Sequence, residues 1–378
     1  MASKLRIGLV APLAESVPPK MYGGTERVVS YLSEALVCQG HEVTLFASAD
    51  SDTSAHLVPC SPRALRLDEN CEDPLVWHLL MLEKVYQRID EFDILHSNVH
   101  YLTYSAMRRL QKPLVSTMHG RMDIREYGPL YDEFGEMPLV SISYSQRRPV
   151  PAANWVQTIY HGLPEGLYTP SFGDGKYLAF LGRISPEKRV DSAIQIAKRV
   201  GMPLKVAAKI DNNDRAYFEA EIEPMLDDGQ VEFVGEIGES DKAEFLGNAA
   251  ALIFMIDWPE PFGLAMIEAM ACGTPVIARR RGSISEVVDH GVSGFVCEDE
   301  DEAVEALKDL DTLSRQTVRE TFERRFSAGR MARDYVTAYR EVMLSYHSAG
   351  LDDARHFRTH HRGEFGGQRP GVGRQDLR

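Results

Sequence analysis

The chain repeats one pattern twice, in which short apolar runs alternate with stretches where apolar residues recur at helical spacing. The first run covers residues 5–10, and after a loop a helical pattern extends over residues 25–40. Strands that alternate with helices form a parallel sheet, because each helix returns the chain to the same edge. Further strands in the first half are expected at residues 42–47, 92–96, 113–118 and 138–143. We therefore predict a doubly wound α/β fold.

The pattern is interrupted between Tyr160 and Gly175, where glycine and proline become frequent and the periodicity disappears. It resumes with strands expected at residues 177–181, 204–208, 231–234, 251–255, 275–278 and 294–296. A chain of 378 residues also exceeds what one hydrophobic core usually organises. Two α/β domains are predicted, residues 1–163 and 164–326, and two such domains imply a cleft between them.

The end of the chain is expected to contain one helix and a tail. Apolar residues recur at helical spacing over residues 327–347, which predicts a terminal helix. Residues 348–378 combine Arg, His, Gly and Asp with few large apolar side chains, too few to offset the entropy of ordering the segment. We expect this tail to be disordered.

Composition and charge exclude several classes of protein. No apolar run approaches the ~20 residues that cross a bilayer, and the apolar stretch near the N-terminus is too short for a signal peptide. The five cysteines are scattered, without a CxxC pair that would indicate a zinc or redox site. A formal charge of −14 repels nucleic acid. We expect a cytoplasmic protein with no membrane span and no nucleic-acid partner.

Two segments have the composition of phosphate-binding loops. Gly23 and Gly24 directly precede a helix, and paired glycines let backbone N–H groups approach a phosphate at a helix N-terminus. Arg183 and Lys188 follow the first strand of the second domain, where Arg would donate two hydrogen bonds and Lys would supply a point charge. The alternatives are a glycine turn that serves only geometry and two solvated surface charges.

The segment from Glu260 to Glu268 is the most informative in the chain. Gly263 is expected to begin a helix, so that Glu260 precedes the helix and Glu268 falls in its second turn. The two carboxylates would then reach two parts of one ligand, such as the hydroxyl groups of a sugar and of a ribose. Backbone N–H groups at Phe262, Gly263 and Leu264 would face the ligand between them. The alternative is an exposed loop glutamate and an ordinary helical glutamate.

Residues 260–278, which begin Glu-Pro-Phe-Gly-Leu-Ala-Met-Ile-Glu, resemble the E-x7-E block of the family 4 retaining glycosyltransferases. Matching motifs are Gly182-Arg183 with Lys188, Gly282-Ser283 with Glu286, Gly291 with Gly294, and the loop at Gly23-Gly24. The resemblance spans roughly residues 5–346. It implies the GT-B fold, in which two Rossmann-like domains face a cleft. The second domain would bind the donor, and the terminal helix would cross back to the first, acceptor-side domain.

The resemblance also implies roles for individual residues. Glu260 would hold the hydroxyl groups of the donor sugar, and Glu268 the ribose of the nucleotide. Arg183 and Lys188 would hold the diphosphate. His119, at the end of an expected strand, would form a hydrogen bond to the sugar and is less suited to act as a general base. These residues other than Glu268 are the expected catalytic set, and the donor-binding set is Gly23, Gly24, Lys209, Phe262, Gly263, Leu264, Glu268 and Glu286.

Two segments depart from the family pattern. Ahead of Glu260 the family often has Pro-Ser, whereas this chain has Asp257-Trp258-Pro259. A glycine-rich turn after the second strand of the second domain is replaced by residues 207–211, where Lys209 would add a phosphate or base contact. Both segments lie where the base or the sugar should bind.

The implied reaction is transfer of a hexose from a UDP-sugar to an unidentified acceptor, with retention at the anomeric carbon. No metal or other cofactor is expected, since Arg183 and Lys188 would neutralise the diphosphate. No carboxylate stands out as a covalent nucleophile, so the acceptor would attack from the same face. The alternatives are a sugar-nucleotide epimerase or phosphorylase of the same fold, and a non-catalytic nucleotide-sugar-binding protein. The chain is expected to be a monomer or a homodimer.

Overall fold

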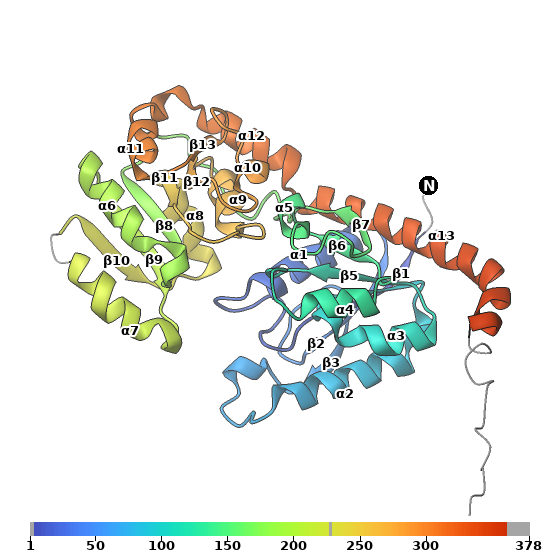
Figure 1. Ribbon diagram of the computed structural model, residues 1–378. Coiled ribbons are helices and arrows are strands. Elements are labelled where there is room, and N and C mark those ends of the chain that lie inside the picture. The colour runs from blue at the N-terminus through green and yellow to red at the C-terminus, as the bar shows by residue number, and fades with distance from the viewer. Residues whose placement is uncertain (1–3, 227–228, 361–378) are drawn as a thin grey trace, which may run out of the picture.

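The computed structural model describes residues 4–226 and 229–360 and contains two parallel β-sheets, each covered by helices (Figure 1). The first sheet has the strand order β3-β2-β1-β4-β5-β6-β7. Its strands are β1 (Arg6–Val10), β2 (Glu42–Ser48), β3 (His56–Ser61), β4 (Ile94–Ser97), β5 (Leu114–Met118), β6 (Leu139–Ser141) and β7 (Trp155–Thr158). The helices that connect them are α1 (Gly24–Cys38), α2 (Pro74–Gln87), α3 (Tyr104–Leu110), α4 (Tyr127–Glu133) and α5 (Tyr144–Arg147). We refer to this part as the N-terminal domain.

The second sheet has the strand order β10-β9-β8-β11-β12-β13 and forms what we call the C-terminal domain. Its strands are β8 (Tyr177–Arg183), β9 (Leu204–Lys209), β10 (Val231–Gly235), β11 (Ala249–Phe254), β12 (Val276–Arg279) and β13 (Gly294–Cys297). Its helices are α6 (Val190–Val200), α7 (Arg215–Tyr217), α8 (Glu239–Gly247), α9 (Leu264–Ala271), α10 (Ile284–Val287), α11 (Glu300–Lys308) and α12 (Arg315–Arg325). The predicted boundary after Leu163 lies between β7 and β8.

Each sheet reverses its strand order at one place, between β1 and β4 in the first and between β8 and β11 in the second. This is the Rossmann-like doubly wound arrangement, and the predicted fold class is confirmed. In such sheets ligands bind beyond the carboxyl ends of the strands at the point of reversal. Ligand-binding residues are therefore expected in the segments that follow β1, β8 and β11.

The chain passes between the domains twice, and the two passages touch. Leu163, between β7 and β8, donates a 2.9 Å hydrogen bond to the carbonyl of Phe326 and accepts one of 2.7 Å from the N–H of Ala328. A Cβ added at Gly162 would lie 2.4 Å from the carbonyl oxygen of Ser327, so only glycine fits this approach. The rings of Tyr160 and Phe326 also lie 6.1 Å apart. The two passages therefore form one compact connection.

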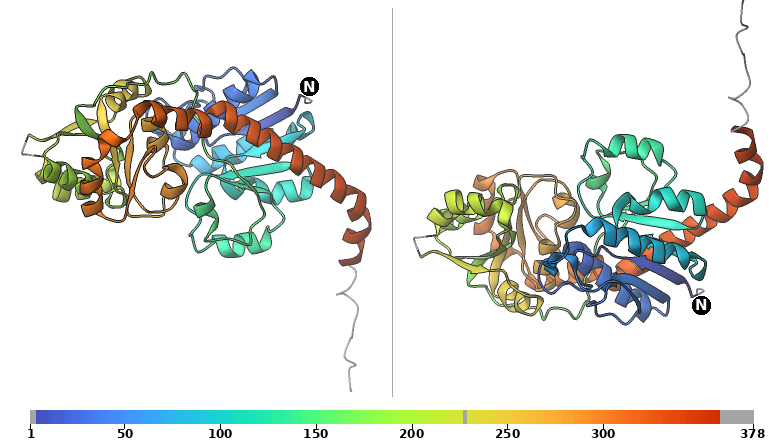
Figure 2. Two further views of the ribbon diagram at one scale, coloured as in Figure 1. Left: turned by 90° about the horizontal axis from the view of Figure 1, so that it is seen from above. Right: turned by 90° about the horizontal axis from the view of Figure 1, so that it is seen from below.

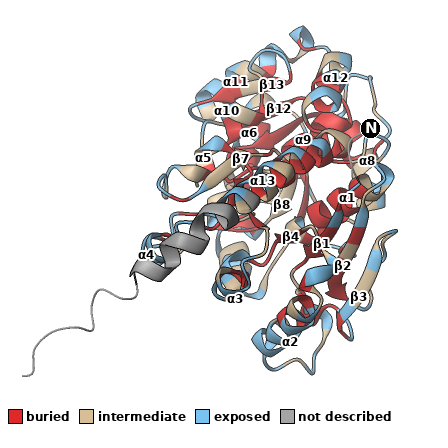
Figure 3. Ribbon diagram, turned by 90° about the vertical axis from the view of Figure 1, so that its right-hand side faces the viewer, coloured by how far each residue is buried: buried red, intermediate tan, exposed pale blue. Residues whose placement is uncertain are grey.

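The last helix, α13 (Ala328–His360), returns from the C-terminal domain to cover the N-terminal one (Figure 2). Tyr335 and Tyr339 of this helix are buried, and burial elsewhere is concentrated in the strands and in helices such as α1 and α9 (Figure 3). His96 of β4 forms 2.7 Å hydrogen bonds to the hydroxyls of Tyr339 and Thr117, and Thr117 in turn contacts the Tyr335 hydroxyl at 2.8 Å. A buried polar network thus fixes α13 to the first sheet.

The helix α13 is longer than the sequence predicted, since it continues to His360 rather than ending at residue 347. The predicted tail of residues 348–378 therefore overlaps the end of this helix. A helix that already exists needs no new nucleation to continue, so α13 can extend past residue 347. The remainder of that tail, residues 361–378, lies outside the described residues. Among the described residues, none of the helices is both long and apolar enough to cross a membrane.

Candidate active site

A cavity of about 960 Å³ lies between the two domains. It is lined from the N-terminal domain by the loop before α1 and by residues after β5, and from the C-terminal domain by the segments after β8, β9 and β11. All predicted site residues except Glu286 line it: Gly23, Gly24, His119, Arg183, Lys188, Lys209, Glu260, Phe262, Gly263, Leu264 and Glu268. Residues predicted from separate motifs therefore meet in one place.

The glycine loop closes the cavity from the N-terminal domain. Gly23 stands at the N-cap position of α1, and a Cβ added to it would lie 2.7 Å from the Cβ of Pro19. A Cβ added to Gly24 would lie 3.6 Å from Cδ1 of Leu264, which belongs to the opposite domain. The absence of side chains at Gly23 and Gly24 thus allows the loop to pack against Pro19 and brings α1 close to α9.

Glu260 and Glu268 stand on either side of the start of α9. Gly263 precedes this helix with a φ of +83°, a conformation that favours glycine. Glu260 is 8% exposed and Glu268 is 4% exposed, so each carboxylate needs a partner. Glu260 pairs with Lys188 at 2.6 Å, and Glu268 pairs with Lys242 at 2.7 Å. Each predicted ligand-binding carboxylate is therefore held by a lysine of its own domain.

The turn at Gly282 and Ser283 supports the loop that contains Glu260. Gly282 has a φ of +57°, and a Cβ added to it would lie 2.3 Å from the Glu260 carbonyl oxygen. Ser283 donates its backbone N–H to that oxygen at 3.0 Å and its hydroxyl to the carbonyl of Phe262, also at 3.0 Å. The motif Gly282-Ser283 therefore fixes the backbone on both sides of the loop.

The cations of the cavity stand at or just after strand ends. Arg183 ends β8 and pairs with Glu187 at 2.8 Å and with Asp214 at 3.2 Å. Lys209 ends β9 and pairs with Asp211 at 3.0 Å. Because these carboxylates are partly exposed, a phosphate in the cavity can compete for the cations.

The segment after Arg183 differs from the single helix that the sequence led us to expect. Pro186–Lys188 form a single 3-10 turn with Ser185 at its N-cap position. Arg189 follows with a φ of +54°, in the left-handed region, before α6 begins. This break in the helix gives Lys188 its direction toward Glu260 rather than along the surface of α6.

Three histidines line the N-terminal wall of the cavity: His100, His119 and His161. The rings of His119 and His161 are stacked with centroids 5.3 Å apart, and Nε2 of His119 lies 2.9 Å from Oδ1 of Asn98. Burial, together with the nearby His100, lowers the pKa of His119 to about 3. The imidazole is therefore neutral near pH 7, and Nδ1 has no hydrogen-bond partner among the described residues.

Glu286 does not line the cavity, in contrast to the prediction. Its carboxylate accepts hydrogen bonds of 2.7 Å from the backbone N–H groups of Tyr144 and Ser145, at the start of α5 in the N-terminal domain. The hydroxyl of Tyr160 donates a third bond at 3.2 Å. The difference arises because Glu286 lies beyond Gly282-Ser283, on a short helix that faces the other domain. Glu286 therefore joins the domains in this structure.

Sequence reasoning missed a buried ionic cluster beside Glu268. Lys242 lies between Glu268 and Glu239, at 2.7 Å and 3.5 Å. Glu239 also pairs with Arg27 of α1 and accepts a hydrogen bond from the hydroxyl of Tyr168. Lys242 and Arg27 both line the cavity, so the cluster links the predicted ribose end of the site to the N-terminal domain. The individual residues belong to no motif, and no signal in the sequence pointed to them.

Comparison with known proteins gives two family matches. Residues 22–185 match the model "Glycosyltransferase Family 4", and residues 169–325 match "Glycosyl transferases group 1". Relatives include glycogen synthase of Mycobacterium tuberculosis, 25% identical over 76% of this chain and 81% of the relative. D-inositol 3-phosphate glycosyltransferase of Mycolicibacterium smegmatis is 26% identical over 88% of this chain and 88% of its own length.

Solved structures of similar fold include sucrose-phosphate synthase from Thermosynechococcus elongatus, with a TM-score of 0.74 and 20% identity over 90% of this chain and 100% of that chain. The Anabaena protein HepE in complex with UDP-glucose gives a TM-score of 0.64 and 19% identity over 91% of this chain and 100% of that chain. These likenesses support the fold, and the family matches cover every strand of the two sheets except β1, with most of the residues that line the cavity. The chain belongs to family 4 of the glycosyltransferases, has the GT-B fold and uses a sugar-nucleotide donor.

Proposed function

We propose that this glycosyltransferase moves a hexose from a UDP-sugar to an acceptor hydroxyl, with retention at the anomeric carbon and without a metal ion. The supporting observation is the order of charges along the cavity. Glu260 and Glu268 lie on either side of the start of α9, Arg183 and Lys209 end β8 and β9, and Lys188 lies in the turn that follows β8. Two carboxylates that bind hydroxyl groups, with cations nearby, match the chemistry of a sugar joined to a ribose through a diphosphate.

In the proposed reaction the bond between the anomeric carbon and the phosphate oxygen breaks. The bond to the acceptor oxygen forms on the same face, and the acceptor proton passes to the departing phosphate oxygen. Arg183 and Lys188 would stabilise the charge on the diphosphate. His119, with a pKa of about 3, is a weak base at neutral pH, which supports a hydrogen-bonding role for its imidazole.

The nucleotide and sugar are the first points to test. The Anabaena protein of this fold was solved with UDP-glucose, and UDP-hexoses are therefore the first donors to try. We expect one sugar nucleotide among UDP-, GDP- and ADP-sugars to raise the melting temperature, since a ligand that binds only the folded state stabilises it. A flat response to all of them contradicts the donor site.

Transfer, epimerisation and phosphorolysis give different products from the same donor. Release of nucleoside diphosphate that depends on an added acceptor indicates transfer, whereas interconversion of the sugar without an acceptor indicates an epimerase. Phosphate-dependent cleavage of a glycoside would indicate a phosphorylase. NMR of the product linkage then reads the anomeric configuration, and an inverted product excludes the same-face mechanism. Binding without any turnover would leave the non-catalytic alternative.

A further inference from the structure

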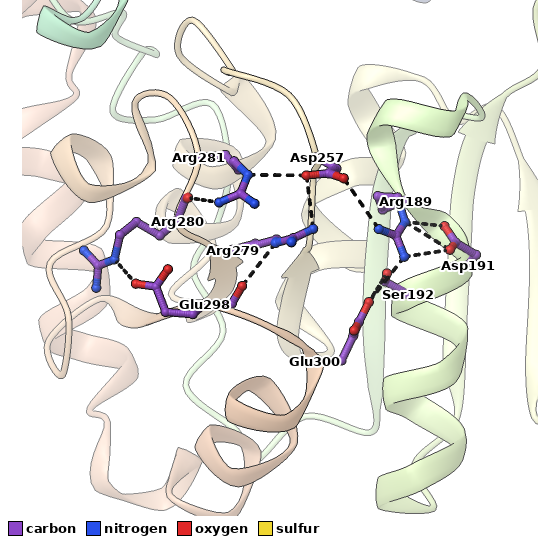
Figure 4. Close-up of polar contacts among 9 residues, drawn as sticks. All are labelled: Arg189, Asp191, Ser192, Asp257, Arg279, Arg280, Arg281, Glu298 and Glu300. Atoms are coloured by element: carbon purple, nitrogen blue, oxygen red, sulfur yellow. Dashed lines mark hydrogen bonds and ion pairs between the residues drawn. The ribbon is translucent and has the colours of Figure 1, made fainter.

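The segment that precedes Glu260 has two neighbouring side chains with different surroundings. Trp258 lines the cavity. Asp257 instead contacts arginines outside the set of residues that line the cavity (Figure 4). Both residues belong to the stretch ahead of Glu260 in which the sequence departs from the Pro-Ser that the resemblance led us to expect.

Trp258 contacts both charged groups that meet at Glu260. Its indole Nε1 donates a 3.0 Å hydrogen bond to Oε2 of Glu260, the same oxygen that Lys188 contacts at 2.6 Å. The Lys188 ammonium also lies 5.0 Å from the centroid of the Trp258 ring, within the range of a cation–π interaction. One indole therefore positions a carboxylate through its N–H and a cation through its face.

The proposed function assigns Lys188 and Glu260 to different parts of the donor. If the diphosphate takes the ammonium of Lys188, Glu260 loses its ionic partner. A buried carboxylate that loses a hydrogen-bond donor is destabilised, and its side chain is then less firmly held for the sugar hydroxyls. The indole N–H donates to Oε2 independently of Lys188, so this hydrogen bond can remain when Lys188 turns to the diphosphate.

We propose that Trp258 is a positioning residue that holds the Glu260 carboxylate in place for the donor sugar while Lys188 pairs with the diphosphate. This inference rests on the proposed function. It makes recognition of the sugar separable from recognition of the nucleotide, because Trp258 acts on the sugar through Glu260.

Asp257 fixes the segment from the opposite side. Its Oδ1 pairs with Arg279 at 3.1 Å and with Arg281 at 3.3 Å, and its Oδ2 lies 3.9 Å from Arg189 (Figure 4). Its backbone N–H also donates a 2.9 Å hydrogen bond to the carbonyl of Glu187. One carboxylate thus contacts three arginines from two segments, which limits the freedom of the residue that follows it.

The arginines of this network are matched by acids and do not form an open anion site. Arg189 also pairs with Asp191 and Glu300, and Arg280 pairs with Glu298. With Asp257, four carboxylates face four guanidinium groups (Figure 4). The network is therefore a support for the loop that contains Trp258 and Glu260.

The test is Trp258→Phe, which keeps an aromatic face for Lys188 and removes the indole N–H. We expect kcat/KM for the sugar nucleotide to fall roughly tenfold, the effect of one hydrogen bond to a charged group. The loss should appear mainly in kcat, while Kd for the free nucleoside diphosphate changes less than about twofold. The matched control is Trp155→Phe, since that indole donates to the carbonyl of Val150 outside the cavity. Unchanged turnover, or an equal loss of nucleoside diphosphate affinity, overturns the inference.

A second measurement does not depend on turnover. The chain has three tryptophans, Trp77, Trp155 and Trp258, so the double variant Trp77→Phe/Trp155→Phe leaves Trp258 as the sole tryptophan. Its emission should shift when nucleoside diphosphate draws Lys188 from the ring, and shift again with the sugar nucleotide. An emission that responds to neither ligand, in a protein that transfers sugar, contradicts the role of Trp258 alone. A wild-type protein that neither binds nor transfers a sugar nucleotide contradicts the proposed function instead.

Discussion

The carboxylate of Glu286 accepts a 2.7 Å hydrogen bond from the backbone N–H of Tyr144, and so joins the C-terminal domain to the N-terminal domain. A second bond from the N–H of Ser145 has the same length. Hydrogen bonds to a charged acceptor are stronger than neutral ones. These hydrogen bonds lie close to the connection between the domains, where Arg325 donates to the carbonyl oxygen of Glu286.

Glu286→Ala should therefore weaken the contact between the domains. We expect the free energy of unfolding to fall by roughly 1–3 kcal/mol, because two backbone N–H groups lose a charged acceptor. Urea titration measures the change. Glu305→Ala is the control, since Glu305 is exposed and pairs with Lys308 on α11, and its loss should cost less than about 0.5 kcal/mol. Equal midpoints for the two variants would show that Glu286 does not join the domains in solution.

Lys188→Ala should weaken binding of the nucleoside diphosphate about tenfold to a hundredfold, the range for a lost hydrogen bond to a charged group. Isothermal titration calorimetry measures the dissociation constant directly. Lys205→Ala serves as the control, because Lys205 pairs with Glu232 and does not line the cavity. If both variants bind like the wild type, Lys188 is not a diphosphate ligand.

Gly282→Ala and Gly291→Ala form a matched pair. Both glycines have positive φ, +57° and +76°, so alanine is strained at each by roughly 1 kcal/mol. At Gly282 the new Cβ would lie 2.3 Å from the Glu260 carbonyl oxygen, whereas at Gly291 no atom of the described residues lies within 4 Å. We expect Gly282→Ala to lose most transferase activity and Gly291→Ala to retain it, as measured by initial rates. Equal activities would contradict the support of the Glu260 loop by Gly282.

The buried imidazoles should make stability depend on pH. Burial, together with His119, lowers the pKa of His96 to about 3, and His119 has a similarly low pKa. An unfolded histidine titrates near pH ~6.5, so below that pH the unfolded chain binds more protons and stability falls as the pH falls. Above about pH 7 the contribution is complete.

The expected loss is about 1.4 kcal/mol per pH unit for each such histidine between pH ~6.5 and pH ~3. His96 should contribute more than His119, because it is fully buried while His119 borders the cavity. Urea midpoints at pH ~7.5, ~6.5 and ~5.5 measure this loss of stability, because these values lie around the ordinary histidine pKa of about 6.5. His96→Gln should flatten the dependence, and His56→Gln, at an exposed position, should leave it unchanged. A wild-type stability that is constant over this range would contradict the expectation.

The fold was largely predictable because buried parallel strands are continuous apolar runs. The strands that were missed, β3 and β7, lie at the two edges of the first sheet. β3 contains Pro59, which is typical of an edge strand, and β7 is only partly buried along its length. An edge strand has one neighbour and needs a weaker apolar pattern, so periodicity did not reveal it.

The candidate site was predictable where a local motif specifies geometry. Gly263 needs a left-handed φ, and this places Glu260 and Glu268 on either side of a helix start. The contact of Lys242 with Glu268 and that of Arg27 with Glu239 could not be predicted. Each arises only when two separate helices pack together. Glu286 was predicted near the donor for its place in a motif, whereas its direction depends on the opposite domain.

The return of α13 to the first sheet has a consequence for synthesis on the ribosome. His96 and its partner Tyr339 are separated by 243 positions, so the ribosome makes nearly the whole chain before the hydroxyl that satisfies this imidazole emerges. The N-terminal domain therefore cannot complete its native core during its own translation. Its final packing waits for the C-terminal domain to be made, which ties the maturation of both halves to the last helix.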